Sequence, residues 1–110
     1  ERLVELGMGE WESRRVPELL AAHPELDLEE PDWYLQAPNG ESFQSIQCRA
    51  QVWLQDEGIA KQAIVVSHGL FGAMLRGSYA DLDYITTWTQ ELPQDAFFKL
   101  SGGRIERISC

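Results

Sequence analysis

Residues 62–67 constrain the fold more than any other stretch of this sequence, because they read QAIVVS and end directly before a His-Gly pair. A continuous run of β-branched side chains is typical of a strand that is covered on both faces in a parallel sheet. The next segment, from Gly69 to about Arg76, has a helical pattern. We therefore predict a buried strand that ends on Ser67 and His68, where a helix begins.

Helical periodicity is clearest in residues 41–56. Apolar side chains recur there at spacings of three and four residues, at Phe43, Ile46, Ala50 and Trp53. This pattern predicts an amphipathic helix. Shorter helices are predicted over residues 16–22 and 81–88.

The remaining segments predict loops and one hairpin. Residues 2–12 are irregular with room for a short strand, and the acidic, proline-rich residues 24–40 form a loop long enough to act as a lid. Residues 95–100 and 104–109 flank Ser-Gly-Gly and predict a β-hairpin. We expect one domain with an α/β fold, in which a mainly parallel sheet has helices on both faces and a C-terminal hairpin follows.

Charge and cysteine content exclude several classes of function. The chain has 18 acidic and 9 basic side chains, and a net charge of -9 argues against binding to nucleic acid or to an anionic membrane. No stretch approaches the roughly 18 apolar residues of a membrane-spanning helix, and no secretory signal is visible. Cys48 and Cys110 form no disulfide framework, which favours a cytoplasmic protein with reduced thiols. No cysteine and histidine spacing suggests a metal.

His68 is the strongest candidate for chemistry. In an open parallel sheet, ligands bind beyond the carboxyl ends of the strands, where His68 is expected to lie. Gly69 allows a tight turn, and the amides that open the following helix attract anions. A histidine beside such a site can donate a hydrogen bond to phosphate or attack it as a nucleophile. The residues alone leave open a second interpretation, in which His68 only bonds to the backbone at the end of a strand.

One resemblance points toward serine hydrolases. The sequence HGLFG, residues 68–72, resembles the oxyanion loop of the α/β-hydrolase fold. Such an enzyme needs a Gly-x-Ser-x-Gly turn and then a further histidine downstream. Neither follows His68, so an α/β-hydrolase fragment is the less favoured alternative.

A broader resemblance covers most of the chain. VVSHG, residues 65–69, resembles the second histidine motif of the histidine phosphatase superfamily, whose fold is that of phosphoglycerate mutase. Residues 38–54 resemble the Gly-Glu-Ser helix of that family, residues 1–13 its Leu-x-Glu and Trp-Glu segment, and residues 92–108 its C-terminal hairpin. The four segments stand in the order of the family.

This resemblance implies phosphatase activity on a phosphomonoester, or mutase-like phosphoryl transfer through a phosphohistidine. It implies that His68 contacts the phosphoryl group, that Glu5 is the general acid or base, and that Gly69 and Leu70 bind the substrate. No cofactor or metal is implied, and the expected partner is a phosphorylated small molecule or a phosphoprotein.

The nucleophile of the family has no counterpart here. That nucleophile is a histidine in an N-terminal Arg-His-Gly motif, whereas His23 is followed by Pro24 and is predicted to be a surface turn residue. We expect residues 1–110 to be the C-terminal part of a larger histidine phosphatase domain and to be inactive alone. The alternative is a non-catalytic interaction module derived from that fold, such as a swapped homodimer.

Overall fold

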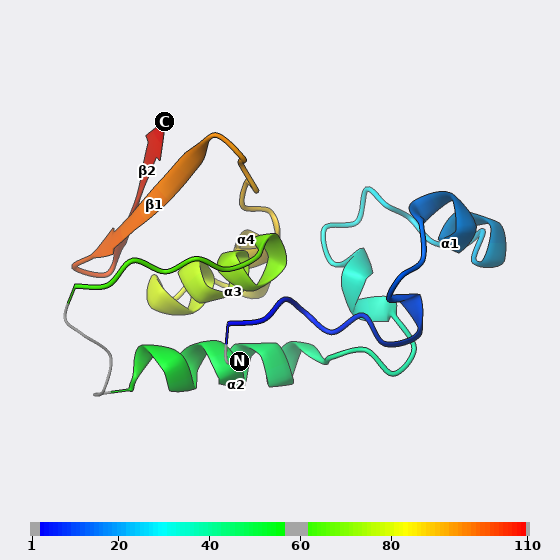
Figure 1. Ribbon diagram of the computed structural model, residues 1–110, viewed down its shortest axis with the longest axis horizontal. Coiled ribbons are helices and arrows are strands. Elements are labelled where there is room, and N and C mark those ends of the chain that lie inside the picture. The colour runs from blue at the N-terminus through cyan, green and yellow to red at the C-terminus, as the bar shows by residue number, and fades with distance from the viewer. Residues whose placement is uncertain (1–2, 57–61, 110) are drawn as a thin grey trace.

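The computed structural model describes residues 3–56 and 62–109, and these residues combine helices with a β-hairpin, an α/β composition (Figure 1). The elements are η1 (Gly9–Trp11), α1 (Val16–Ala22), η2 (Trp33–Gln36), α2 (Phe43–Leu54), α3 (Gly69–Tyr79), α4 (Tyr84–Trp88), β1 (Ala96–Ser101) and β2 (Arg104–Ser109). Within the described residues, none of the helices is long and apolar enough to cross a membrane. Cys48 has a free thiol, and Cys110 lies outside the described residues.

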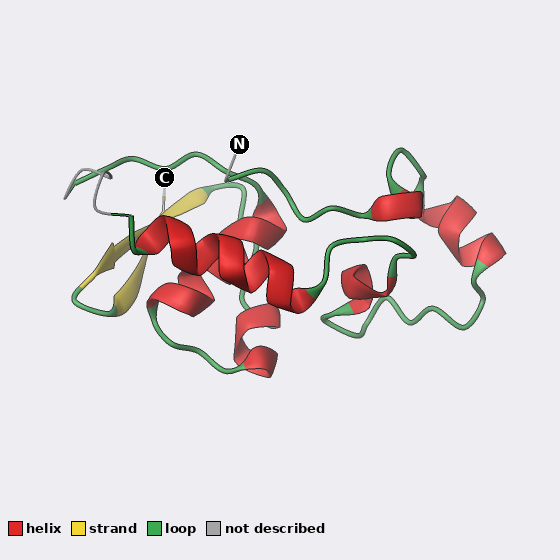
Figure 2. Cartoon of the chain, turned by 90° about the horizontal axis from the view of Figure 1, so that it is seen from below, coloured by secondary structure: helices red, strands yellow, loops and turns green. Residues whose placement is uncertain are grey.

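Helix α2 confirms the amphipathic pattern and carries the main core. Ser42 caps it, because the Ser42 side chain accepts a hydrogen bond of 3.1 Å from the Ser45 amide. Ile46 and Ala50 are fully buried on the face that packs against α3. The core cluster consists of Leu6, Ile46, Ala50, Phe71, Met74, Leu75 and Trp88. Figure 2 shows α2 lying across the other helices of this half of the molecule.

A second, smaller core holds α1 and the acidic loop. Its buried members are Trp11, Leu19, Leu26 and Ala37. The Pro-Asn-Gly turn closes against η1, where the Glu10 amide donates a 2.9 Å hydrogen bond to the Pro38 carbonyl. Gly9 has a φ of 53°, and an added Cβ would lie 2.2 Å from that same carbonyl oxygen. Only glycine fits this approach.

The C-terminal hairpin forms as predicted. Ala96 pairs with Ser109 and Ser101 with Arg104 in an antiparallel register, and Gly102 and Gly103 turn the chain with positive φ. Arg76 of α3 holds the hairpin to the helices, because its guanidinium lies 3.9 Å from the centre of the Phe98 ring.

The predicted parallel sheet is not observed, because the one sheet in the described residues is this antiparallel pair. Residues 62–67 form no strand, and Ile64 and Val66 are 96% and 86% exposed. A strand requires neighbours that supply hydrogen bonds, and no described segment pairs with this one. Residues 3–12 likewise form no strand and contain η1 instead.

Candidate functional site

His68 stands directly before α3 as its N-cap residue. Its carbonyl accepts a 2.7 Å hydrogen bond from the Gly72 amide, whereas its side chain makes no capping hydrogen bond. The residue is exposed, so the imidazole is accessible beside the first turn of the helix. The predicted start of a helix directly after His68 is confirmed, although the run before it is not paired as a strand.

Glu5 occupies the N-terminus of the same helix. Its Oε2 accepts a 2.9 Å hydrogen bond from the Leu70 amide, and its Oε1 accepts one of 2.7 Å from the Phe71 amide. The Leu6 amide adds a third donor at 2.8 Å. A carboxylate is stabilised there because the first amides of a helix lack intrahelical partners and the helix dipole favours negative charge. The structure thus brings Glu5 and His68 together at one helix start.

Gly69 and Leu70 form the first turn beside them. An added Cβ at Gly69 would meet only Leu92 Cδ1, at an ordinary distance of 3.8 Å. The protein's own packing therefore does not require glycine at this position. Leu70 contributes its amide to Glu5 and its side chain to a neighbouring cavity.

The segment that carries Glu5 is fixed by backbone contacts on both sides. Ser67 Oγ donates a 2.6 Å hydrogen bond to the Leu3 carbonyl, and Arg49 Nη1 donates one of 3.0 Å to the Val4 carbonyl. Leu6 is buried in the main core with 3% of its surface exposed. These contacts hold Glu5 against α3, although Glu5 and its partner amides are more than 60 residues apart in the sequence.

The ion pair between Glu41 and Arg49 supports this segment, and sequence reasoning missed it. Arg49 Nε and Nη2 each donate a 2.8 Å hydrogen bond to the Glu41 carboxylate, and Arg49 also stacks 4.6 Å from the centre of the Phe71 ring. The Glu41 amide donates a hydrogen bond of 2.8 Å to the Gly7 carbonyl. The hydrogen bond from Arg49 lowers the pKa of the Glu41 carboxyl. No helical spacing indicated the pair, because Glu41 lies before α2 and side chains that pair on a helix are three or four residues apart.

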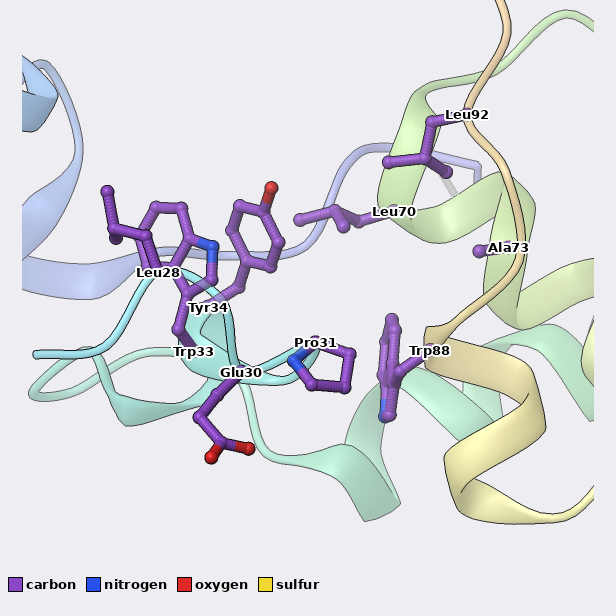
Figure 3. Close-up of a pocket in the computed structure, with 9 residues that line it drawn as sticks. All are labelled: Leu28, Glu30, Pro31, Trp33, Tyr34, Leu70, Ala73, Trp88 and Leu92. Atoms are coloured by element: carbon purple, nitrogen blue, oxygen red, sulfur yellow. The ribbon is translucent and has the colours of Figure 1, made fainter.

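A cavity of about 160 Å³ lies beside the start of α3 (Figure 3). Leu28, Glu30, Pro31, Trp33 and Tyr34 line it from the acidic loop. Leu70 and Ala73 of α3, Trp88 of α4 and Leu92 complete the lining. The loop predicted over residues 24–40 therefore lines a cavity that reaches Leu70, in the first turn of α3.

His23 lies elsewhere, directly after α1, with its ring centre 5.6 Å from that of Trp11. Its Nδ1 lies 3.5 Å from Glu25 Oε1. This position agrees with the prediction of a turn residue. Among the residues that the structure describes, no group of three or more His, Cys, Asp or Glu side chains is placed to hold a metal ion.

Comparison with families of known proteins gives one result. The model of the histidine phosphatase superfamily (branch 1) matches residues 1–103. No curated protein and no solved structure matches the chain. The match spans Glu5, α2, His68 and the first strand of the hairpin.

Proposed function

Because the chain belongs to the histidine phosphatase superfamily, we propose that it forms part of a site for phosphoryl transfer from a phosphomonoester. The observation that supports the proposal is that Glu5 and His68 both lie at the N-terminus of α3. A helix N-terminus attracts anions, and an accessible histidine beside it supplies a further hydrogen-bond donor to a phosphoryl oxygen. The substrate is a phosphorylated small molecule or a phosphoprotein, and the protein acts in the cytoplasm.

In this proposal the nucleophile is a histidine outside these residues, in an Arg-His-Gly motif of the complete domain. Its ring nitrogen attacks phosphorus as the bond to the ester oxygen breaks, and the phosphoryl group then passes to water in a phosphatase or to a hydroxyl in a mutase. His68 stabilises the charge on the phosphoryl oxygens, and Glu5 protonates the departing oxygen. Gly69 lets the phosphoryl group approach the backbone closely.

The present position of Glu5 has a consequence for binding. The amides of Leu70 and Phe71 that would hold a phosphoryl oxygen are bonded to the Glu5 carboxylate. A bound phosphoryl group must displace that carboxylate. The displaced side chain would remain next to the phosphoryl group, where it takes up a proton from solvent and donates it to the leaving oxygen.

The same proposal accounts for residues 62–67. The missing part of the domain would supply neighbouring strands, so that Ile64 and Val66 become buried in a mainly parallel sheet. Residues 1–110 are then the C-terminal part of a larger domain, and we expect them alone to hydrolyse no aryl phosphate.

Two histidine variants test the assignment of His68. We expect inorganic phosphate to shift the amide NMR signals of Leu70 and Phe71 in the wild-type chain and in His23→Ala, and to shift them much less in His68→Ala. Equal shifts in both variants would contradict a role for His68 in phosphate binding. Hydrolysis of p-nitrophenyl phosphate that is lost in His68→Ala would show that the nucleophile lies within these residues.

A second candidate function is a non-catalytic interaction module that pairs with another copy of itself. The exposed, β-branched side chains of Ile64 and Val66 favour it, because an unpaired run of this kind is a template for strand pairing. Light scattering should then show a dimer that Val66→Lys dissociates and that Val52→Lys, at an exposed position of α2, does not. A monomer at all concentrations would exclude this function.

A further inference from the structure

The cavity beside α3 has about the volume of a pocket for one ring. Trp33 and Tyr34 stack on each other, with ring centres 4.0 Å apart, and Figure 3 shows them on one side of the cavity. Leu70 and Ala73 face them from α3, and Trp88 closes one end. The volume of about 160 Å³ is close to that of an apolar cavity of ~150 Å³ that accepts benzene.

The lining also restricts the charge of the occupant. Among the lining residues, only Glu30 and the phenol of Tyr34 are ionisable. Figure 3 shows the Glu30 carboxylate pointing away from the rings. The lining side chains therefore offer mainly apolar and aromatic surface. A negatively charged group would find no positively charged side chain among the lining residues, so its burial there is unfavourable.

Leu70 connects this cavity to the start of α3. Its side chain lines the cavity, whereas its amide belongs to the pair of amides at which we place the phosphoryl group. A phosphomonoester bound at those amides would therefore direct its organic group toward the rings. We propose that the cavity binds the leaving group of the substrate and selects an uncharged ring of about six atoms. The substrates are then phosphate monoesters of phenols or of similar small alcohols that contain a ring. This inference rests on the proposed function.

Binding measurements with small probes test the inference without turnover. Phenyl phosphate should bind the 110-residue chain about tenfold or more tightly than methyl phosphate, because burying an aromatic ring is worth about 1.5–3 kcal/mol. Phosphoglycolate, which carries a carboxylate in place of the ring, should bind no more tightly than methyl phosphate. Phenol alone should shift the indole NMR signals of Trp33 and Trp88.

A matched pair of variants assigns the effect to the cavity. Leu92 lines the cavity but is 45% exposed, so Leu92→Asn adds polarity there with little risk to folding and no change in charge. Val52 is 52% exposed on α2, away from the cavity, so Val52→Asn is the control. We expect Leu92→Asn to remove most of the advantage of phenyl over methyl phosphate, and Val52→Asn to preserve it.

The outcomes separate this inference from the proposed function. If both phosphates shift the Leu70 amide but bind equally well, the phosphate site stands and selection of a ring is refuted. If phenol binds as tightly as phenyl phosphate and both weaken in Leu92→Asn, the ring pocket stands and the phosphate site fails. If none of the probes binds, both proposals are overturned.

Discussion

Replacing Glu5 by alanine removes the contact that fastens the N-terminal segment to α3. The carboxylate accepts hydrogen bonds from the amides of Leu6, Leu70 and Phe71. Loss of an N-terminal cap typically costs about 1 kcal/mol, and loss of a negative charge at a helix N-terminus about 0.3–1 kcal/mol. Two amides of α3 lose their acceptor here, but Glu5 is only partly buried and water replaces part of the loss. We expect the free energy of unfolding to fall by about 2 kcal/mol in Glu5→Ala.

Urea denaturation followed by far-UV circular dichroism measures this change. Glu12→Ala is the matched control, because it removes the same charge from an exposed residue of the same segment and should change stability by less than about 0.5 kcal/mol. Glu5→Gln keeps one acceptor oxygen and should lie between the two. If Glu5→Ala and Glu12→Ala lose equal stability, the reasoning from the hydrogen bonds to α3 is refuted.

Phosphate provides a second measurement on the same variant. In Glu5→Ala the amides of Leu70 and Phe71 no longer donate to a carboxylate, so phosphate binds them without displacing one. At ten times its Kd, a ligand of the folded state adds about 1.4 kcal/mol to stability. We expect phosphate to stabilise Glu5→Ala more than the wild-type chain. Equal stabilisation of the two proteins would show that phosphate does not bind at these amides.

Two further predictions concern the packing that positions the site. Gly77→Ala should destabilise the fold by about 1–3 kcal/mol in urea, because its Cβ would lie 2.5 Å from Thr87 Oγ1. Gly72→Ala in the same helix meets nothing within 4 Å and should stabilise by about 0.5–1 kcal/mol; a loss in both would contradict the packing argument. The lowered pKa of Glu41 beside Arg49 implies stability that is present above the ordinary value of 4.5 and is lost as the pH falls through the lowered pKa. The stability difference between the wild-type chain and Glu41→Gln should therefore shrink between about pH 6 and about pH 3, and a constant difference would refute the assignment.

Elements that depend on neighbours in sequence could be predicted from the sequence. The spacing of Phe43, Ile46 and Ala50 predicted α2, and the Ser-Gly-Gly turn predicted the hairpin, because helix periodicity and turn chemistry act over a few residues. The predicted helix after His68 also forms and extends to Tyr79.

Features that depend on contacts between residues far apart in the sequence could not be predicted from short sequence patterns. Residues 62–67 have the composition of a buried strand, yet a strand requires hydrogen-bonding neighbours that the described residues do not supply. The resemblance to a family indicated Glu5 and His68 as a pair, but nothing in the sequence showed that the Glu5 carboxylate bonds to the amides of α3. Such a contact between residues far apart leaves no periodic signal.

The bonds between Glu5 and α3 also bear on the order in which the molecule folds. They join residues that are 65 and 66 positions apart, whereas the bonds of α2 and of the hairpin join near neighbours. Closing a long loop costs more entropy than closing a short one, and non-local contacts slow folding. We therefore expect the helices to form first and Glu5 to reach α3 late. In kinetic terms, Glu5→Ala should mainly accelerate unfolding and leave the folding rate nearly unchanged.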